Sequence, residues 1–118
     1  MNTRFNYLYR DAANYKEWGE VVFGGFVTDG LIARFTRALE SGEFFIADQI
    51  RIPEVFPLTW PRYDDDHCWH ESAGFESTAA NPDDPFARTL EHFVDEVEQV
   101  AIAGWRDFVP QERHLRRR

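Results

Sequence analysis

The stretch RFNYLYRDAANYKEWGEVVF, residues 4–23, decides the fold because it contains two alternating segments joined by a short polar link. Successive side chains of a strand point to opposite faces, so the first segment predicts a half-buried strand with Phe5, Tyr7 and Tyr9 on one face. Residues 15–23 give a second strand, with Tyr15, Val21 and Phe23 on one face and Trp18 and Val22 on the other. Asp and Asn in the link favour a turn. The stretch therefore predicts an antiparallel hairpin.

Two later stretches have the apolar spacing of helices. The first covers residues 29–40, with Thr28 or Asp29 as its cap and Gly42 at its end. The second has Asp84 as the expected N-cap, Pro85 as the first helical residue and Gly104 as the end. Its apolar stripe is the clearest periodic pattern in the chain and comprises Phe86, Leu90, Phe93, Val94, Val97, Val100 and Ala101.

Residues 43–52 and 67–75 read as two more strands, which gives the order ββαββα. This order predicts an α+β fold: a single-layer antiparallel sheet of about four strands with two helices on one face. We expect one domain over residues 1–110, since 118 residues suit one core. Residues 111–118 should form a basic, frayed tail.

The charge of the chain is uneven and excludes some partners. The net charge is −8, and residues 63–105 contribute most of it, with eleven acidic side chains against the single cation Arg88. Such a surface repels the phosphates of nucleic acids and anionic lipids, and it suits a basic protein partner. One cysteine, no apolar leader and no membrane-length apolar run predict a cytoplasmic protein.

Residues 53–65 form an extended loop with three prolines at intervals of four, which exclude a helix interior or a central strand. The loop carries Val55, Phe56, Leu58 and Trp60. These side chains either pack back onto the core, which is the commoner outcome, or form an apolar patch. A patch would be a candidate surface for partner binding or for a two-fold homodimer.

The stretch DDDHCWHE, residues 64–71, concentrates groups that bind metals. On a strand Asp66, Cys68 and His70 share a face, and all three are possible ligands of zinc or iron. Alternate strand residues lie about 6.5–7 Å apart, which is too far for direct convergence on one ion. The competing interpretation is a structural strand that Trp69 and Phe75 anchor in the core. Catalysis by Cys68 would need a nearby base and a lowered thiol pKa.

Three segments resemble a family of small, uncharacterised bacterial proteins. They are RFNYLYRDA with NYK near the N-terminus, GEFFIA at residues 42–47, and DDH with WHE between residues 65 and 71. The resemblance covers about half of the chain and ends before the acidic helix. It implies a bacterial cytosolic setting and no assigned activity, so it supplies no functional residues.

These patterns favour a non-catalytic, acidic protein-interaction module, such as an inhibitor, an immunity or antitoxin-like protein, or an assembly subunit. No catalytic motif occurs in the sequence, so we predict neither catalytic residues nor a cofactor. The predicted partner-binding residues are Glu91, Asp95 and Glu98 on the outer face of the second helix, with Phe56, Leu58 and Trp60 on the loop. The alternative is a metal-binding protein or metal-dependent enzyme that uses the Asp64–Glu71 cluster.

Overall fold

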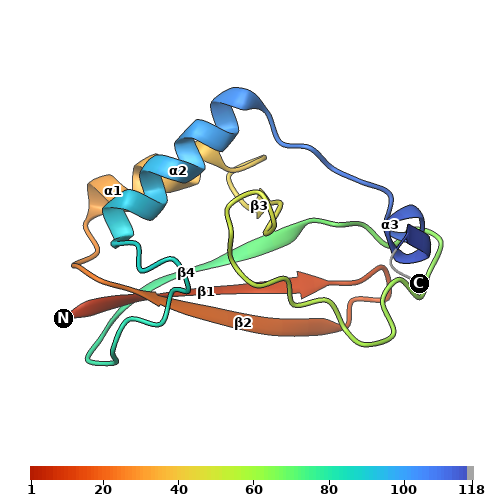
Figure 1. Cartoon of the computed structure of the whole chain (residues 1–118), viewed down its shortest axis with the longest axis horizontal. Helices are drawn as coiled ribbons and strands as arrows, with labels where there is room; N and C mark the ends of the chain where they lie inside the picture. Colours follow the sequence, from red (N-terminus) through yellow and green to blue (C-terminus); the bar gives the residue numbers. More distant parts are fainter. Residues whose placement is uncertain (117–118) are drawn as a thin grey trace.

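The computed structural model describes residues 1–116, which form one curled antiparallel sheet with helices on one side (Figure 1). The strands are β1 (Asn2–Arg10), β2 (Lys16–Phe23), β3 (Phe44–Phe45) and β4 (His70–Thr78), arranged in the order β2-β1-β4-β3. The helices α1 (Asp29–Ala38) and α2 (Leu90–Ala103) lie side by side over the sheet, and α3 (Pro110–Arg116) lies at the far end. The predicted α+β class is confirmed.

The predicted hairpin forms with an unbroken register from Thr3 opposite Phe23 to Arg10 opposite Lys16. Its packing depends on Gly19, because a Cβ at this position would lie 2.7 Å from Tyr7 Cζ. The missing side chain therefore gives the Tyr7 ring its place against β2. On the other side of β1, strand β4 contains one additional residue between Ser72 and Phe75, and Gly74 takes the positive φ of 93° that this bulge needs.

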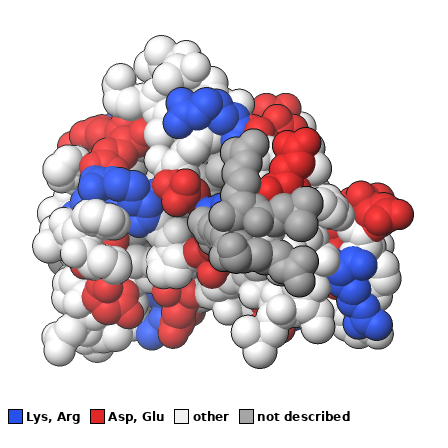
Figure 2. All heavy atoms as spheres, turned by 45° about the vertical axis from the view of Figure 1, so that its right-hand side comes forward, with Lys and Arg blue, Asp and Glu red and all other residues white. Residues whose placement is uncertain are grey.

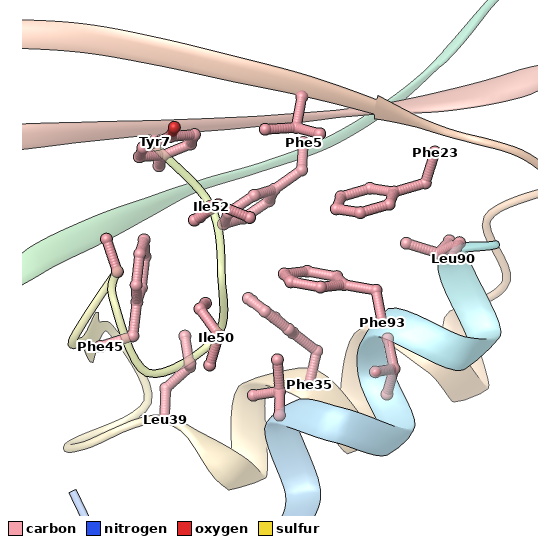
Figure 3. Close-up of a cluster of buried hydrophobic side chains, with 14 residues drawn as sticks. Phe5, Tyr7, Phe23, Phe35, Leu39, Phe45, Ile50, Ile52, Leu90 and Phe93 are labelled. Atoms are coloured by element: carbon pink, nitrogen blue, oxygen red, sulfur yellow. The ribbon is translucent and has the colours of Figure 1, made fainter. Parts of the chain in front are cut away.

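Aromatic side chains fill the space between the sheet and the two helices (Figure 3). Phe5 is at the centre, and its ring lies 5.1 Å from Phe35 of α1 and 5.9 Å from Phe93 of α2. Phe93 also stacks on Phe23 at 4.3 Å. Inward residues of β1 and β2 thus meet the apolar stripes of both helices, as the alternation and the helical spacing predicted.

The third predicted strand, residues 43–52, is mostly wrong: only Phe44–Phe45 pair with β4. Two tight turns follow, with Gln49 N–H donating to the Ile46 carbonyl and Arg51 N–H to the Asp48 carbonyl. Arg51 has a φ of 59°, which a strand does not allow. The turns still bury Ile46, Ala47, Ile50 and Ile52. The apolar spacing of these residues therefore resembled that of a strand, although the backbone forms turns.

The second helix begins later than predicted, at Leu90 with Thr89 as its N-cap. Ala87 has a φ of 53°, which a right-handed helix does not allow, so the helix cannot begin before this residue. Asp84, the expected cap, is buried and forms an ion pair with the equally buried Arg88. Leu90 N–H donates to the Gly24 carbonyl, so a contact with the end of β2 fixes where α2 starts. Gly104 ends the helix, as predicted.

Three further boundaries differ from the predictions. Helix α1 ends at Ala38 with Leu39 as its C-cap, whereas the sequence suggested Glu40. Strand β4 begins at His70 and not at His67. Residues 111–116 of the expected frayed tail belong to α3, and residues 117–118 lie outside the described part of the chain. No helix within residues 1–116 is long and apolar enough to cross a membrane.

Candidate functional site

The residues of DDDHCWHE before His70 form an extended loop that leads into β4. Asp66, Cys68 and His70 are buried, whereas His67 and Trp69 are partly exposed on the other side. The alternation of faces predicted for this stretch therefore exists, although strand pairing starts only at His70. The inward and outward sides of the stretch have different chemistry.

Asp66 is the inward carboxylate, and its contacts are structural. Its Oδ1 accepts from Ala12 N–H at 2.9 Å, and its Oδ2 accepts from Arg62 N–H at 2.9 Å and Tyr63 N–H at 3.0 Å. Burial alone would raise the pKa of Asp66, but these backbone donors outweigh it and lower the pKa. Asp66 thus joins the loop at residues 62–63 to the hairpin turn.

Cys68 and His70 continue the buried side. Cys68 Sγ accepts from Phe108 N–H at 3.3 Å, and burial raises the pKa of the thiol. His70 Nε2 accepts from Val55 N–H at 3.0 Å, so the ring is neutral with its proton on Nδ1. Burial lowers the pKa of His70 to about 4, which keeps the ring neutral at pH 7. An unreactive thiol and a buried neutral imidazole do not form a nucleophilic pair.

Metal binding by Asp66, Cys68 and His70 has no supporting geometry. Within residues 1–116, no group of three or more His, Cys, Asp or Glu side chains is placed to hold a metal ion. The lone pairs that would bind the metal already accept backbone hydrogen bonds on all three side chains. Metal binding by this stretch therefore stays a prediction that no contact of the structure favours.

The outward side of the stretch lines an open groove of about 380 Å³ formed by Glu40, Phe44, His67 and Trp69. We call these four residues the Trp69 groove. His67 Nδ1 accepts from Trp69 N–H at 3.0 Å, which fixes the imidazole beside the indole. The Trp69 ring lies next to the Trp105 ring, with 6.3 Å between their centroids. Trp105 in turn donates from Nε1 to the Ala38 carbonyl at the end of α1.

A second hollow continues from the groove past His67 and Trp69, and its rim includes Asp64 and Asp107. Within the described part of the chain, neither of these carboxylates nor that of Glu40 has an ion-pair partner. Aromatic surface and uncompensated negative charge therefore meet at this end of the sheet. Figure 2 shows that acidic side chains on the visible side form several patches with basic ones between them.

Two carboxylates of the predicted acidic face of α2 share one cation within the molecule. Arg34 of α1 donates to Asp95 Oδ1 at 2.5 Å and to both oxygens of Glu98. These bonds lower the pKa of Glu98. Glu91 is exposed and has no ion-pair partner among the side chains of residues 1–114. Of the three predicted partner-binding carboxylates, two instead hold α1 against α2.

The proline-rich loop packs back onto the core at Val55, Phe56 and Trp60, three of its four apolar positions. Phe56 and Trp60 stack at 3.7 Å, and Trp60 Nε1 donates to Tyr9 Oη at 2.9 Å. The Phe56 ring also lies 4.9 Å from the His70 ring. Only Leu58 is fully exposed, at 106%. Phe56, Leu58 and Trp60 therefore do not form one continuous apolar patch.

Sequence analysis missed the two arginines that organise the acidic segment and the two residues that complete the groove. Neither arginine was given a partner, and Arg88 was noted only for its charge. A lone arginine four residues after an aspartate was the available signal for Arg88, since i, i+4 pairs meet on a helical turn. No sequence pattern indicated that Glu40 and Phe44 line the groove, because only the pairing of strands in the sheet brings them next to Trp69.

Comparisons with protein-family models, with curated proteins and with solved structures give no match to this chain.

Proposed function

We propose that this protein is a non-catalytic interaction module whose Trp69 groove binds a basic segment of a partner protein. The observation that carries the proposal is an aromatic groove that contains Glu40 and adjoins a hollow with Asp64 and Asp107 on its rim. None of these three carboxylates has an ion-pair partner within residues 1–114. Such a surface suits an arginine or lysine side chain. The indole face attracts the cation, and the carboxylates accept its N–H groups.

The distribution of charge favours the Trp69 groove, and not the outer face of α2, as the partner-binding surface. Asp95 and Glu98 already satisfy Arg34, so a partner would have to break an internal ion pair to use them. Glu40, Asp64 and Asp107 have no such internal ion pair among the side chains that the structure describes. Charge complementarity of this kind speeds encounter and selects the partner, while the buried aromatic contact sets most of the affinity.

The buried side of the same stretch supports a role without catalysis. Asp66, Cys68 and His70 hold the loop in place through backbone hydrogen bonds and are hidden from solvent. Their rigidity would present His67 and Trp69 in a fixed arrangement, which reduces the entropy lost on binding. The inward side chains of the stretch then hold its backbone in place, and the outward side chains of His67 and Trp69 form the binding surface.

The test is a titration of the labelled protein with a short arginine-containing peptide, followed by NMR. We expect shift changes at the Trp69 indole and at the amides of Glu40 and Phe44, weakening with added salt. A citrulline peptide of the same sequence is the control ligand, since it keeps shape and loses charge. Changes confined to α2, or equal changes with both peptides, would contradict the proposal.

Variants separate the two acidic surfaces. Combined Glu40→Gln and Asp64→Asn should weaken peptide binding, whereas Glu91→Gln, an exposed and unpaired carboxylate on α2, should leave it unchanged. The same variants then serve in affinity capture from the native host at low and high salt. Reversal of Asp95 or Glu98 is a poor test, because it would also disrupt the contact between α1 and α2 through Arg34.

A further inference from the structure

Strand β2 is an outer strand of the sheet, and only one end of its free edge is covered. Val22 N–H donates to Asp83 Oδ1 at 2.7 Å, and the Val22 carbonyl accepts from Asp83 N–H at 3.0 Å. Both backbone groups of Val22 therefore point away from β1. Because this direction alternates along a strand with an unbroken register, those of Lys16, Trp18 and Glu20 point the same way.

The covered and open parts of this edge differ. Residues 83–90 cover β2 beyond Val22, since Leu90 N–H also donates to the Gly24 carbonyl. Within the described part of the chain, no backbone or side-chain group bonds the outward N–H and C=O groups of Lys16, Trp18 and Glu20. An unpaired edge of this kind is a template for another strand. Trp18 lies in its middle with 64% of its surface exposed.

The side chains of this edge are complementary to a second copy in one antiparallel register. When Trp18 lies opposite Trp18 of the second copy, Lys16 lies opposite Glu20 and Glu20 opposite Lys16. All three positions have outward backbone groups, so each pair can exchange two hydrogen bonds. Opposite charges across strands stabilise the pair, and cross-strand aromatic pairs do so as well.

The other registers that match outward backbone groups are worse. Centring the pair on Lys16, Glu17 or Glu20 places a charged residue opposite its own copy, which is destabilising. Centring it on Gly19 places Lys16 opposite Val22, whose backbone groups Asp83 already occupies. The edge is therefore self-complementary in the Trp18 register, and its neighbouring surface includes the hollow beside Asn6, Trp18 and Gly19.

We propose that two copies of this chain associate through residues 16–20 of β2, antiparallel about a two-fold axis at Trp18, to form one continuous eight-stranded sheet. Glu20 also forms an ion pair with Arg4, with 2.8 Å between Oε2 and Nε, so Lys16 of the second copy extends an existing ion-pair network. The Trp69 groove includes Phe44 of β3, at the opposite end of the strand order. Association through β2 thus leaves both grooves free for partners.

Amide hydrogen exchange by NMR tests the geometry directly. The amides of Glu17, Gly19 and Val21 face β1 and should be protected at every concentration. The amides of Trp18 and Glu20 should become protected only as concentration rises, in step with an increase in sedimentation mass above 13.9 kDa. A monomer at all concentrations, with these two amides unprotected, would overturn the proposal.

A charge swap tests the register. Lys16→Glu and Glu20→Lys should each abolish self-association, because like charges then face each other in both pairs. Mixing the two variants should restore it as a heterodimer, since one copy presents two carboxylates at positions 16 and 20 and the other two ammonium groups. The restored association also shows that both variants are folded. Failure to form the heterodimer, or an equal loss with the control Glu17→Lys, would refute this register.

Discussion

Replacing Arg88 by methionine should destabilise the protein more than any other single change to a charged side chain. The five N–H groups of its guanidinium all donate, two to Asp84 and one each to Glu96 and to the carbonyls of Ile50 and Arg51. The Arg88 and Asp84 side chains are 1% and 0% exposed. One buried cation therefore joins the segment before α2, helix α2 itself and the turns after β3.

The magnitude follows from what the substitution leaves behind. Asp84 would stay buried without its cation, and two carbonyls would lose their donors. Removing one member of a buried pair costs about 3–5 kcal/mol. With an unfolding entropy of roughly 2 cal/mol/K per residue, a loss of about 4 kcal/mol lowers Tm by about 16 °C in a chain of this size. Urea denaturation at pH 7 measures the difference in unfolding free energy.

The pH dependence gives an independent check with a definite sign. Burial raises the pKa of Asp84, but hydrogen bonds and charge from Arg88 outweigh it, so the pKa in the folded protein is lowered. That contribution is present above the unfolded pKa and is lost as the pH falls. In the Arg88→Met variant the side-chain contacts of Arg88 are absent, so burial raises the pKa of Asp84. The gap between wild type and Arg88→Met should therefore shrink as the pH falls from 7 toward about 4.

Two controls separate the buried ion pair from charge and size. Arg106→Met removes an exposed guanidinium that makes no ion pair with the side chains of residues 1–114, and stability should change by less than about 0.5 kcal/mol. Combining Asp84→Asn with Arg88→Met removes the stranded charge and should recover part of the loss. A loss below about 1 kcal/mol for Arg88→Met, or a gap that widens at low pH, would refute the reasoning.

Three further changes test other parts of the structure. Gly19→Ala places a Cβ 2.7 Å from Tyr7 Cζ and should cost about 1–3 kcal/mol in chemical denaturation, whereas Gly24→Ala, with its nearest neighbour at 3.8 Å, should cost less; equal losses would argue against the close contact. The folded pKa of His70 is about 4, below its ordinary value of 6.5, so its contribution is present above pH 6.5 and is lost as the pH falls toward 4. His70→Gln should therefore flatten the stability-against-pH curve by about 3 kcal/mol over that window, and an unchanged slope would contradict the assignment. The thiol of Cys68 should react with a disulfide reagent only as fast as the protein opens, and rapid labelling of the native state would show that it is accessible.

The sequence by itself determined the parts of the fold whose information is local. Alternation in residues 4–23 predicted the hairpin, and the stripe containing Phe93 and Val97 predicted α2, because each pattern repeats with the period of its own backbone. Charge counting located the acidic segment, and the proline spacing located the long loop. The alternation of Asp66, Cys68 and His70 with their neighbours was also readable, but the choice of buried face was wrong, because the expected core anchor Trp69 lies on the partly exposed side.

Only the tertiary structure decided what those side chains do, because their partners are distant in sequence. Asp95 and Glu98 look solvent-facing on a helical wheel, yet Arg34 lies beside them through the packing of α1 on α2. Residues 46–52 have the apolar content of a strand, but Arg88 binds their carbonyls and a turn forms. The Trp69 groove brings Glu40 and Phe44 next to His67 and Trp69. These two parts of the chain are far apart in sequence and meet only because β3 pairs with β4, so no local pattern predicts the groove. Hydrophobic periodicity fixes which faces are buried, and only the packing of elements fixes which charges remain unpaired.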